Sequence, residues 1–352
     1  MVRISWLAVL LGTILFMRPM RADEPISPPS ATSLQVQQAV ERSIRYIQVE
    51  SADWQKTRKC AACHHVPMPL WALSEAQRHG YGIDEKFLAD TVESLLGNKE
   101  NLIASKIFPD PASPPDPRPQ GRGLNMGLPF LATAAHSLES LSEGQKETLK
   151  LVLAEIVQKQ QSDGSWEFFV TLRRPPINES QTTDAAWIIM ALDPRTTVEA
   201  PDSERTALEK ARAWFESAQF ADIQQEKALK LLLAARAGSR RDKLQPLIEE
   251  LLSLQRTDGG WSQTVPEPRS DAFATGQSLF ALSLADCTVE RPAIKRAVDF
   301  LVATQLPDGS WPMVSRSTPN GDPGSATLLT PITCAASSWA VLGLSRLVPN
   351  ER

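Results

Sequence analysis

QQSDGSW at residues 160–166, QRTDGGW at 255–261 and QLPDGSW at 305–311 are three copies of one heptad. Each copy follows an amphipathic helical run and precedes a polar loop that leads into a helix of small residues. Chance does not produce three such heptads in one chain. The repeating unit is therefore a pair of helices, which indicates either an open solenoid or a ring that closes on itself.

Helical periodicity outward from the heptads predicts six such pairs. The expected helices are residues 34–50 with 66–79, 84–105 with 123–138, 143–161 with 180–192, 203–219 with 224–237, 241–255 with 271–285, and 290–306 with 332–347. The first helix of each pair has one polar face, whereas the second is apolar almost all round and must be buried. We expect an all-α fold, a six-pair α/α toroid that forms one domain over residues 34–348.

The composition agrees with a folded helical protein and excludes one class of partner. The chain has 352 residues, of which 42% are hydrophobic and 22% charged, with a net charge of −4. Its basic pairs, Arg173 with Arg174 and Arg240 with Arg241, are isolated, and no basic stripe is interleaved with aromatic residues. Nucleic acid is therefore not expected to bind.

The repeated heptads resemble the QW motifs of the squalene-hopene cyclase, terpenoid cyclase and protein prenyltransferase superfamily, and the resemblance covers most of the chain. In that family the motif ties outer helices together: Asp and Gly shape the turn, Gln reaches backbone groups at a helix end, and Trp packs beside it. The resemblance thus implies a structural role for the repeated residues. They are Gln160, Asp163, Gly164, Trp166, Gln255, Asp258, Gly259, Trp261, Gln305, Asp308, Gly309 and Trp311.

The resemblance also implies a test for activity, because class II cyclases protonate their substrate with a DxDD motif at the start of an inner helix. The equivalent tetrads here are QTTD at 181–184, DAFA at 271–274 and TCAA at 333–336, and DxDD occurs nowhere in the chain. No side chain at the acid position can protonate an alkene, so cyclisation by the DxDD route is not expected. Asp184 and Asp271 remain as catalytic candidates, although each also suits a helix N-terminal cap.

Two other toroid chemistries receive no local support from the sequence. The prenyltransferase branch uses a zinc site built from Asp, Cys and His, whereas no His follows His136 in this chain. A pair of carboxylates for glycoside hydrolysis stays open, because nothing in the sequence singles such a pair out. Whether the protein is an enzyme is left open at this point.

Cys60-Ala-Ala-Cys63-His64 matches the attachment pattern of c-type haem, with two thiols for thioether bonds and His64 as axial ligand to the iron. We expect covalent haem c here, with Met126 as the candidate sixth ligand. A Cys60–Cys63 disulfide and a metal site using His64 or His65 remain as alternatives. The CxxCHH segment at 60–65 also resembles an insert of exported cyclase-like toroid proteins.

The N-terminus has the pattern of a signal peptide over residues 1–22. A basic start precedes the 14-residue apolar run Ile4 to Met17, which is shorter than the ~20 residues of a membrane-spanning helix. We expect cleavage near Ala22, a flexible leader over 23–33, and an extracytoplasmic protein, periplasmic or secreted, with no membrane span in its mature chain.

Three functions follow as hypotheses from these observations. In the first, the toroid binds an apolar isoprenoid or quinone-like lipid near a rim haem and exchanges electrons with a redox partner. In the second, the chain is an atypical enzyme acting on a terpenoid or prenyl substrate. In the third, it is a non-catalytic structural scaffold, since fold alone does not fix function.

Overall fold

The computed structural model describes residues 30–58, 64–105, 107–108, 123–167, 175–177, 179–193, 200–264, 266, 269–316 and 331–350. The expected signal peptide and most of the expected leader lie outside these residues. The compact unit begins at Ala31. Within the described residues there is no β-strand, and no helix combines the length and the apolar character needed to cross a bilayer.

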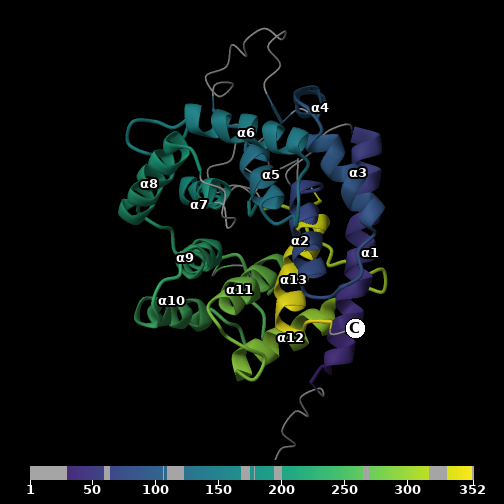
Figure 1. Cartoon of the computed structure of the whole chain (residues 1–352). Coiled ribbons are helices and arrows are strands. Elements are labelled where there is room, and N and C mark those ends of the chain that lie inside the picture. Colours follow the sequence, from purple (N-terminus) through teal and green to yellow (C-terminus); the bar gives the residue numbers. More distant parts are fainter. Residues whose placement is uncertain are drawn as a thin grey trace, which may run out of the picture. The chain divides into compact units, whose positions relative to one another are not determined.

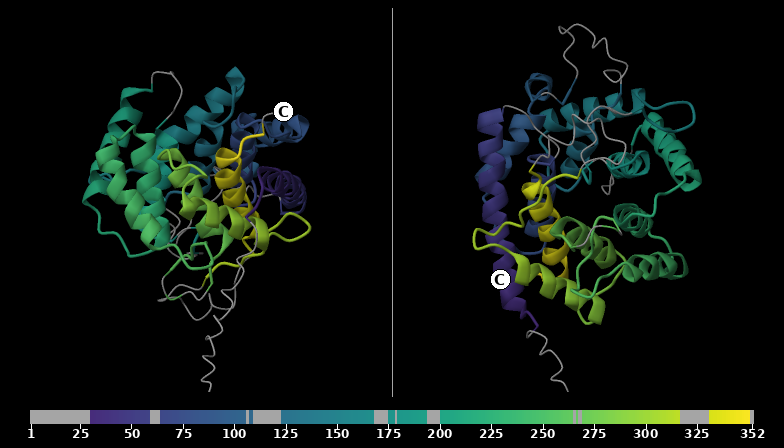
Figure 2. Two further views of the ribbon diagram at one scale, coloured as in Figure 1. Left: turned by 90° about the horizontal axis from the view of Figure 1, so that it is seen from below. Right: turned by 180° about the vertical axis from the view of Figure 1, so that it is seen from behind.

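The helices alternate along the chain between an outer and an inner layer (Figures 1 and 2). The outer helices are α1 (Ser33–Arg58), α3 (Glu85–Leu96), α4 (Lys99–Ala104), α6 (Glu143–Gln158), α8 (Asp202–Ser217), α10 (Arg241–Ser253) and α12 (Pro292–Thr304). The inner helices are α2 (Pro67–Arg78), α5 (Gly127–Ala135), α7 (Gln181–Leu192), α9 (Gln224–Arg236), α11 (Ala272–Leu284) and α13 (Thr333–Leu347).

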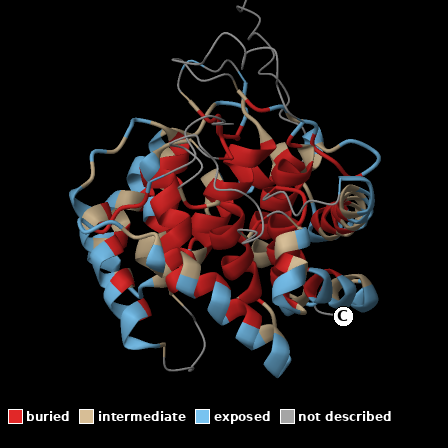
Figure 3. Ribbon diagram, turned by 90° about the horizontal axis from the view of Figure 1, so that it is seen from above, coloured by how far each residue is buried: buried red, intermediate tan, exposed pale blue. Residues whose placement is uncertain are grey.

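The inner helices form a closed ring. Each contacts the next in the order α2, α5, α7, α9, α11 and α13, and α13 packs in turn against α2. Nearly every side chain of α7, α11 and α13 is buried, and Figure 3 shows this buried centre surrounded by half-exposed outer helices. The prediction of an all-α, six-pair toroid is confirmed, and its physical basis is the contrast between apolar second helices and amphipathic first ones.

One expected helix is wrong. The segment 84–105 is not a single helix but breaks into α3 and α4 at Gly97 and Asn98. Asn98 leaves the helical conformation, and its side chain accepts a hydrogen bond from the Asn101 backbone N–H at 2.9 Å, which starts α4 as a new helix. The hydrophobic period continues across the break, and for this reason periodicity alone did not reveal it.

Aromatic rings fill the centre of the ring of inner helices. Trp71 of α2 lies 5.5 Å from Trp187 of α7 and 5.3 Å from both Phe280 of α11 and Trp339 of α13, measured between ring centroids. Phe130 of α5 lies 4.1 Å from Trp187. Edge-on and tilted contacts of this kind favour ring pairs and anchor five of the six inner helices to one another.

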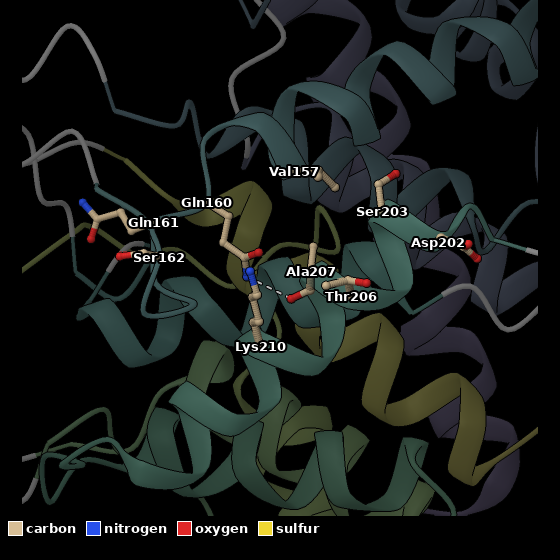
Figure 4. A pocket seen from close by; sticks show the side chains of 9 residues that line it. All are labelled: Val157, Gln160, Gln161, Ser162, Asp202, Ser203, Thr206, Ala207 and Lys210. Carbon is tan, nitrogen blue, oxygen red and sulfur yellow. Dashed lines mark hydrogen bonds between the residues drawn. The ribbon is translucent and has the colours of Figure 1, made fainter.

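The three heptads make one repeated set of contacts between outer helices. The Gln160 amide donates to the Gly164 carbonyl in its own turn and, at 2.9 Å, to the Ala207 carbonyl of α8 (Figure 4). Gln255 reaches Ala293 of α12 in the same way at 2.7 Å. Each heptad therefore joins the end of one outer helix to the first turns of the next.

The Trp of each heptad fixes the turn from the other side. Its indole N–H donates to the carbonyl ten residues earlier, with Trp166, Trp261 and Trp311 bonding to Ile156, Leu251 and Leu301 at 2.7, 2.8 and 3.0 Å. These carbonyls lie at the C-terminal ends of outer helices, where they would otherwise lack partners. The heptad thus caps one helix while it binds the next.

Candidate functional site

Buried polar side chains gather where the neighbouring inner helices α7 and α9 begin. Glu226, in the first turn of α9, is 3% exposed. Its Oε1 atom accepts hydrogen bonds from the hydroxyls of Ser180, at 2.7 Å, and Thr182. Its Oε2 atom is buried and has no hydrogen-bond partner. A buried carboxyl oxygen left in this way costs free energy unless a ligand or water reaches it.

The sequence holds the two hydroxyls in place through a capping box. The Ser180 hydroxyl accepts from the Thr183 backbone N–H at 3.1 Å, and the Thr183 hydroxyl accepts from the Ser180 N–H at 2.9 Å. This reciprocal pair orients Ser180 at the start of α7, so its O–H donates toward Glu226. Thr183, which the sequence analysis aligned with the acid of the DxDD motif, is thus engaged in capping.

Two amide side chains beside Glu226 show how α9 is set against α11. Gln224 donates from Nε2 to the Ala274 carbonyl at 3.0 Å and to the Ser278 hydroxyl at 2.8 Å. Gln225 is 2% exposed, and neither atom of its amide has a partner. Gln225 and Glu226 therefore contribute three unpartnered polar atoms in succession at the start of α9.

Asp271 caps the neighbouring inner helix α11. Its Oδ1 accepts from the Ala274 backbone N–H at 2.8 Å, and its Oδ2 accepts from the Gln263 amide at 3.2 Å. Burial raises the pKa of the Asp271 carboxyl to about 6, against the smaller opposing effect of these hydrogen bonds. Gln263 in turn accepts from Arg316 at 2.7 Å, and Arg316 forms an ion pair with Glu179.

The structure does not bring the two carboxylates predicted from sequence together. Asp184 is buried in the first turn of α7, whereas Asp271 caps α11, and α9 lies between these helices in the ring. Glu226 could not be predicted from the QW repeats, because the fourth helix pair, to which it belongs, has lost its heptad. The available signal was the polar triplet Gln224 to Glu226 at the start of an inner helix.

The expected haem site falls partly outside the described residues, since Cys60 and Cys63 are not among them. His64 is 5% exposed, and its ring centroid lies 4.4 Å from that of His65 and 6.1 Å from that of Trp54. The Nε2 atom of His64 is buried. Because both cysteines lie outside the described residues, covalent haem at Cys60, Cys63 and His64 stays a prediction.

The other residues considered for ligation lie at separate helix ends. Met126 precedes α5 and is 9% exposed. Burial lowers the pKa of His65 to about 4, and its ring stacks on Trp54 at 3.7 Å. Among the described residues no group of three or more His, Cys, Asp and Glu side chains has the arrangement of a metal site. Cys287 and Cys334 are both buried free thiols.

Comparison with known proteins agrees with the fold. No family model matches the chain. Over 228 residues it is 27% identical to the drimenyl diphosphate synthase of Streptomyces showdoensis, a match that covers 62% of this chain and 40% of that protein. The chain thus spans less than half the length of this curated relative.

Two solved structures share the architecture across nearly their whole length. One is a variant of the type II terpene cyclase MstE from Scytonema in complex with geranylgeranyl dihydroxybenzoate, with 17% identity, a TM-score of 0.56, and coverage of 90% of this chain and 98% of that one. The other is a glycosidase with 12% identity, a TM-score of 0.54, and coverage of 90% and 99%. The likeness to both shows the fold. The chain therefore has the α/α toroid fold of these proteins, and its sequence is similar to that of a terpenoid synthase over 228 residues.

Proposed function

We propose that this protein binds an isoprenoid-like apolar molecule, with its head group at the start of α7 and α9 and its hydrocarbon part against the aromatic centre of the toroid. The observation that carries the proposal is the buried, unpartnered Oε2 atom of Glu226 beside the unpartnered amide of Gln225. Buried polar atoms of this kind are rare unless something binds them.

The aromatic centre lies next to these polar atoms along the same helices. Trp187 follows Thr182 by five residues in α7, a rise of about 7.5 Å along the helix axis. The indole N–H groups of Trp187 and Trp339 are also buried without partners. A polar group at one end and aromatic walls at the other match a ligand that has a head group and a hydrocarbon tail.

A binding measurement tests this proposal. We expect geranylgeraniol to quench the tryptophan fluorescence of the purified protein in a saturable way, and Glu226→Gln to weaken that binding. Glu249→Gln is the matched control, because Glu249 is an exposed carboxyl on the outer helix α10. No saturable binding of this probe, together with no lipid in an organic extract of the native protein, would contradict the proposal.

Catalysis on a terpenoid or prenyl substrate is the alternative that the same residues support. Glu226, Asp184 and Asp271 are the carboxyl groups that could transfer a proton at the starts of α7, α9 and α11. Incubation with a prenyl substrate and analysis of products by mass spectrometry separates the two: a product lost in Asp184→Asn or Glu226→Gln supports an enzyme. Absence of both product and binding leaves the structural scaffold.

Export and covalent haem are separate proposals carried by the sequence alone. The N-terminal pattern of residues 1–22 supports export, and Cys60, Cys63 and His64 match the haem c pattern. Haem can be tested by expressing the protein in a host with cytochrome c maturation and staining the denatured chain for haem. A stained band that is absent from Cys60→Ala supports covalent haem. A colourless protein leaves the disulfide or metal alternative.

A further inference from the structure

The charges around Glu226 restrict which head group can bind there. Three carboxyl groups, those of Asp184, Glu226 and Asp271, lie at the starts of three successive inner helices. Of the described cations near these helix starts, Arg316 pairs with Glu179 and donates to Gln263. Lys227, the residue after Glu226, pairs with Asp222 and Glu250. Among the described residues, the carboxyl groups at these helix starts therefore outnumber the cations, and both Arg316 and Lys227 are already paired.

A diphosphate requires the opposite surroundings. It carries two or more negative charges, which proteins bind with Arg or Lys side chains, helix N-termini or carboxylate-held Mg²⁺. The first turn of α9 offers a helix N-terminus, but Glu226 already occupies that turn. Among the described residues no cluster of His, Cys, Asp and Glu suits a metal ion that could bridge carboxyls to phosphate.

We propose that the site takes an isoprenoid with a neutral hydroxyl head group, such as a prenyl alcohol or prenyl phenol, and rejects prenyl diphosphates. This inference rests on the proposed binding function and adds the class of ligand. The hydroxyl of such a head group donates a hydrogen bond to Glu226 Oε2, and the Gln225 amide offers both a donor and an acceptor to the same group.

The contacts of Glu226 explain why one oxygen is left for the ligand. The hydroxyls of Ser180 and Thr182 both donate to Oε1, which fixes the orientation of the carboxyl group. Oε2 therefore remains as the carboxyl oxygen that can accept a hydrogen bond from the ligand. In Glu226→Gln the amide oxygen takes the place beside the two hydroxyls, and the NH₂ group replaces Oε2. A carboxyl group is then lost and a donor gained where the head group binds.

The test compares geranylgeraniol with geranylgeranyl diphosphate by titration against the full chain in one detergent. We expect the wild type to bind the alcohol at least tenfold more tightly, and Glu226→Gln to reduce that ratio about tenfold. Glu249→Gln should leave the ratio unchanged. Thr182→Val, which removes one donor to Oε1, should weaken binding of the alcohol while leaving the diphosphate weak.

Each outcome separates this inference from the proposed function. Binding of neither probe contradicts the proposed function. Equal or tighter binding of the diphosphate by the wild type overturns the hydroxyl preference while isoprenoid binding stands. Circular dichroism shows whether Glu226→Gln folds. If it does not, the ratio of the two wild-type affinities and the effect of Thr182→Val still test the preference for a hydroxyl head group. A ratio unchanged in a folded Glu226→Gln variant removes Glu226 from the recognition of the head group.

Discussion

The side-chain amide of Gln305 donates to the Ala39 carbonyl at 2.8 Å, so the last outer helix is bonded to the first across 266 positions of sequence. The same amide donates to Gly309 in its own turn, and Arg42 of α1 donates to the Gln305 Oε1 atom. The third QW heptad therefore closes the outer layer, as the contact between α13 and α2 closes the inner one.

Removal of this link should lower stability by a predictable amount. We expect Gln305→Ala to reduce the free energy of unfolding by about 1–2 kcal/mol, because it removes two hydrogen bonds and leaves Arg42 without its acceptor. Gln245→Ala removes only a bond to Glu249 one turn away on α10, and should cost under about 0.5 kcal/mol. Urea denaturation measures both, and equal losses would show that the closing link contributes nothing special.

Gly309 should tolerate no side chain. It adopts φ +90°, and an added Cβ would lie 2.4 Å from the Arg42 carbonyl oxygen. Gly309→Ala should therefore cost at least about 2 kcal/mol from strain and displacement of α1. Gly238→Ala shares a positive φ in open space and should cost about 1 kcal/mol, whereas Gly82→Ala meets neither obstacle and should be near neutral. Thermal denaturation of the three variants separates the clash from the strain, and a Gly309→Ala loss no larger than that of Gly238→Ala would rule out the clash.

Two buried tryptophans differ in whether the indole N–H has a partner. Trp261 donates to the Leu251 carbonyl at 2.8 Å, whereas the Trp187 N–H is buried without a partner. Replacement by Phe removes similar volume from each site, so the loss of the hydrogen bond makes Trp261→Phe about 1 kcal/mol more costly than Trp187→Phe. Denaturant midpoints at constant m-value give the comparison, and the reverse order would contradict this account.

The Asp271 carboxyl should make stability depend on pH in a defined direction. Its pKa is about 6 in the folded protein because of burial, against 3.8 for the ordinary group. Between pH 4 and pH 6 the unfolded chain loses the proton and the folded chain keeps it. The contribution of the Asp271 carboxyl group to the free energy of unfolding is therefore fully present below about pH 4 and is lost as the pH rises through 6. Since Asp271 is only partly buried, the loss should be about 2 kcal/mol.

Asp271→Asn isolates this contribution, because Asn keeps an oxygen that accepts from the Ala274 N–H and still caps α11. The difference in unfolding free energy between wild type and variant should change by about 2 kcal/mol from pH 4 to pH 7. Asp84→Asn, at the exposed cap of α3, controls for the loss of one carboxyl group. A difference that does not vary with pH would show that Asp271 titrates alike in both states.

Much of the fold could be predicted from the sequence because the repeats encode it locally. The spacing of Gln, Asp, Gly and Trp in each heptad specifies a turn whose contacts lie within ten residues, as in the bond from Trp166 to Ile156. The break between α3 and α4 could not be predicted from hydrophobic period, because it depends on the capping preference of Asn98.

The candidate site could be predicted only in part, since it depends on contacts between helices far apart in sequence. Thr182 and Glu226 are 44 residues apart, and only the packing of α7 against α9 places the hydroxyl on the carboxyl group. Asp184 and Asp271 were visible as acids near helix starts, and the predicted order of helix pairs already placed residues 224–237 between them. Which side-chain atoms meet between these helices was not predictable.

The sequence by itself determined the repeating helix pair, the apolar character of the inner helices and the structure of each QW turn, because these depend on side-chain type and on contacts within one repeat. The tertiary structure alone decided that the ring closes through α13 and α2, which side chains of neighbouring helices meet and which polar atoms are left without partners. Those properties arise only when the ring is complete, since burial removes water from Glu226 and Gln225 and thereby turns two ordinary polar side chains into a candidate binding site.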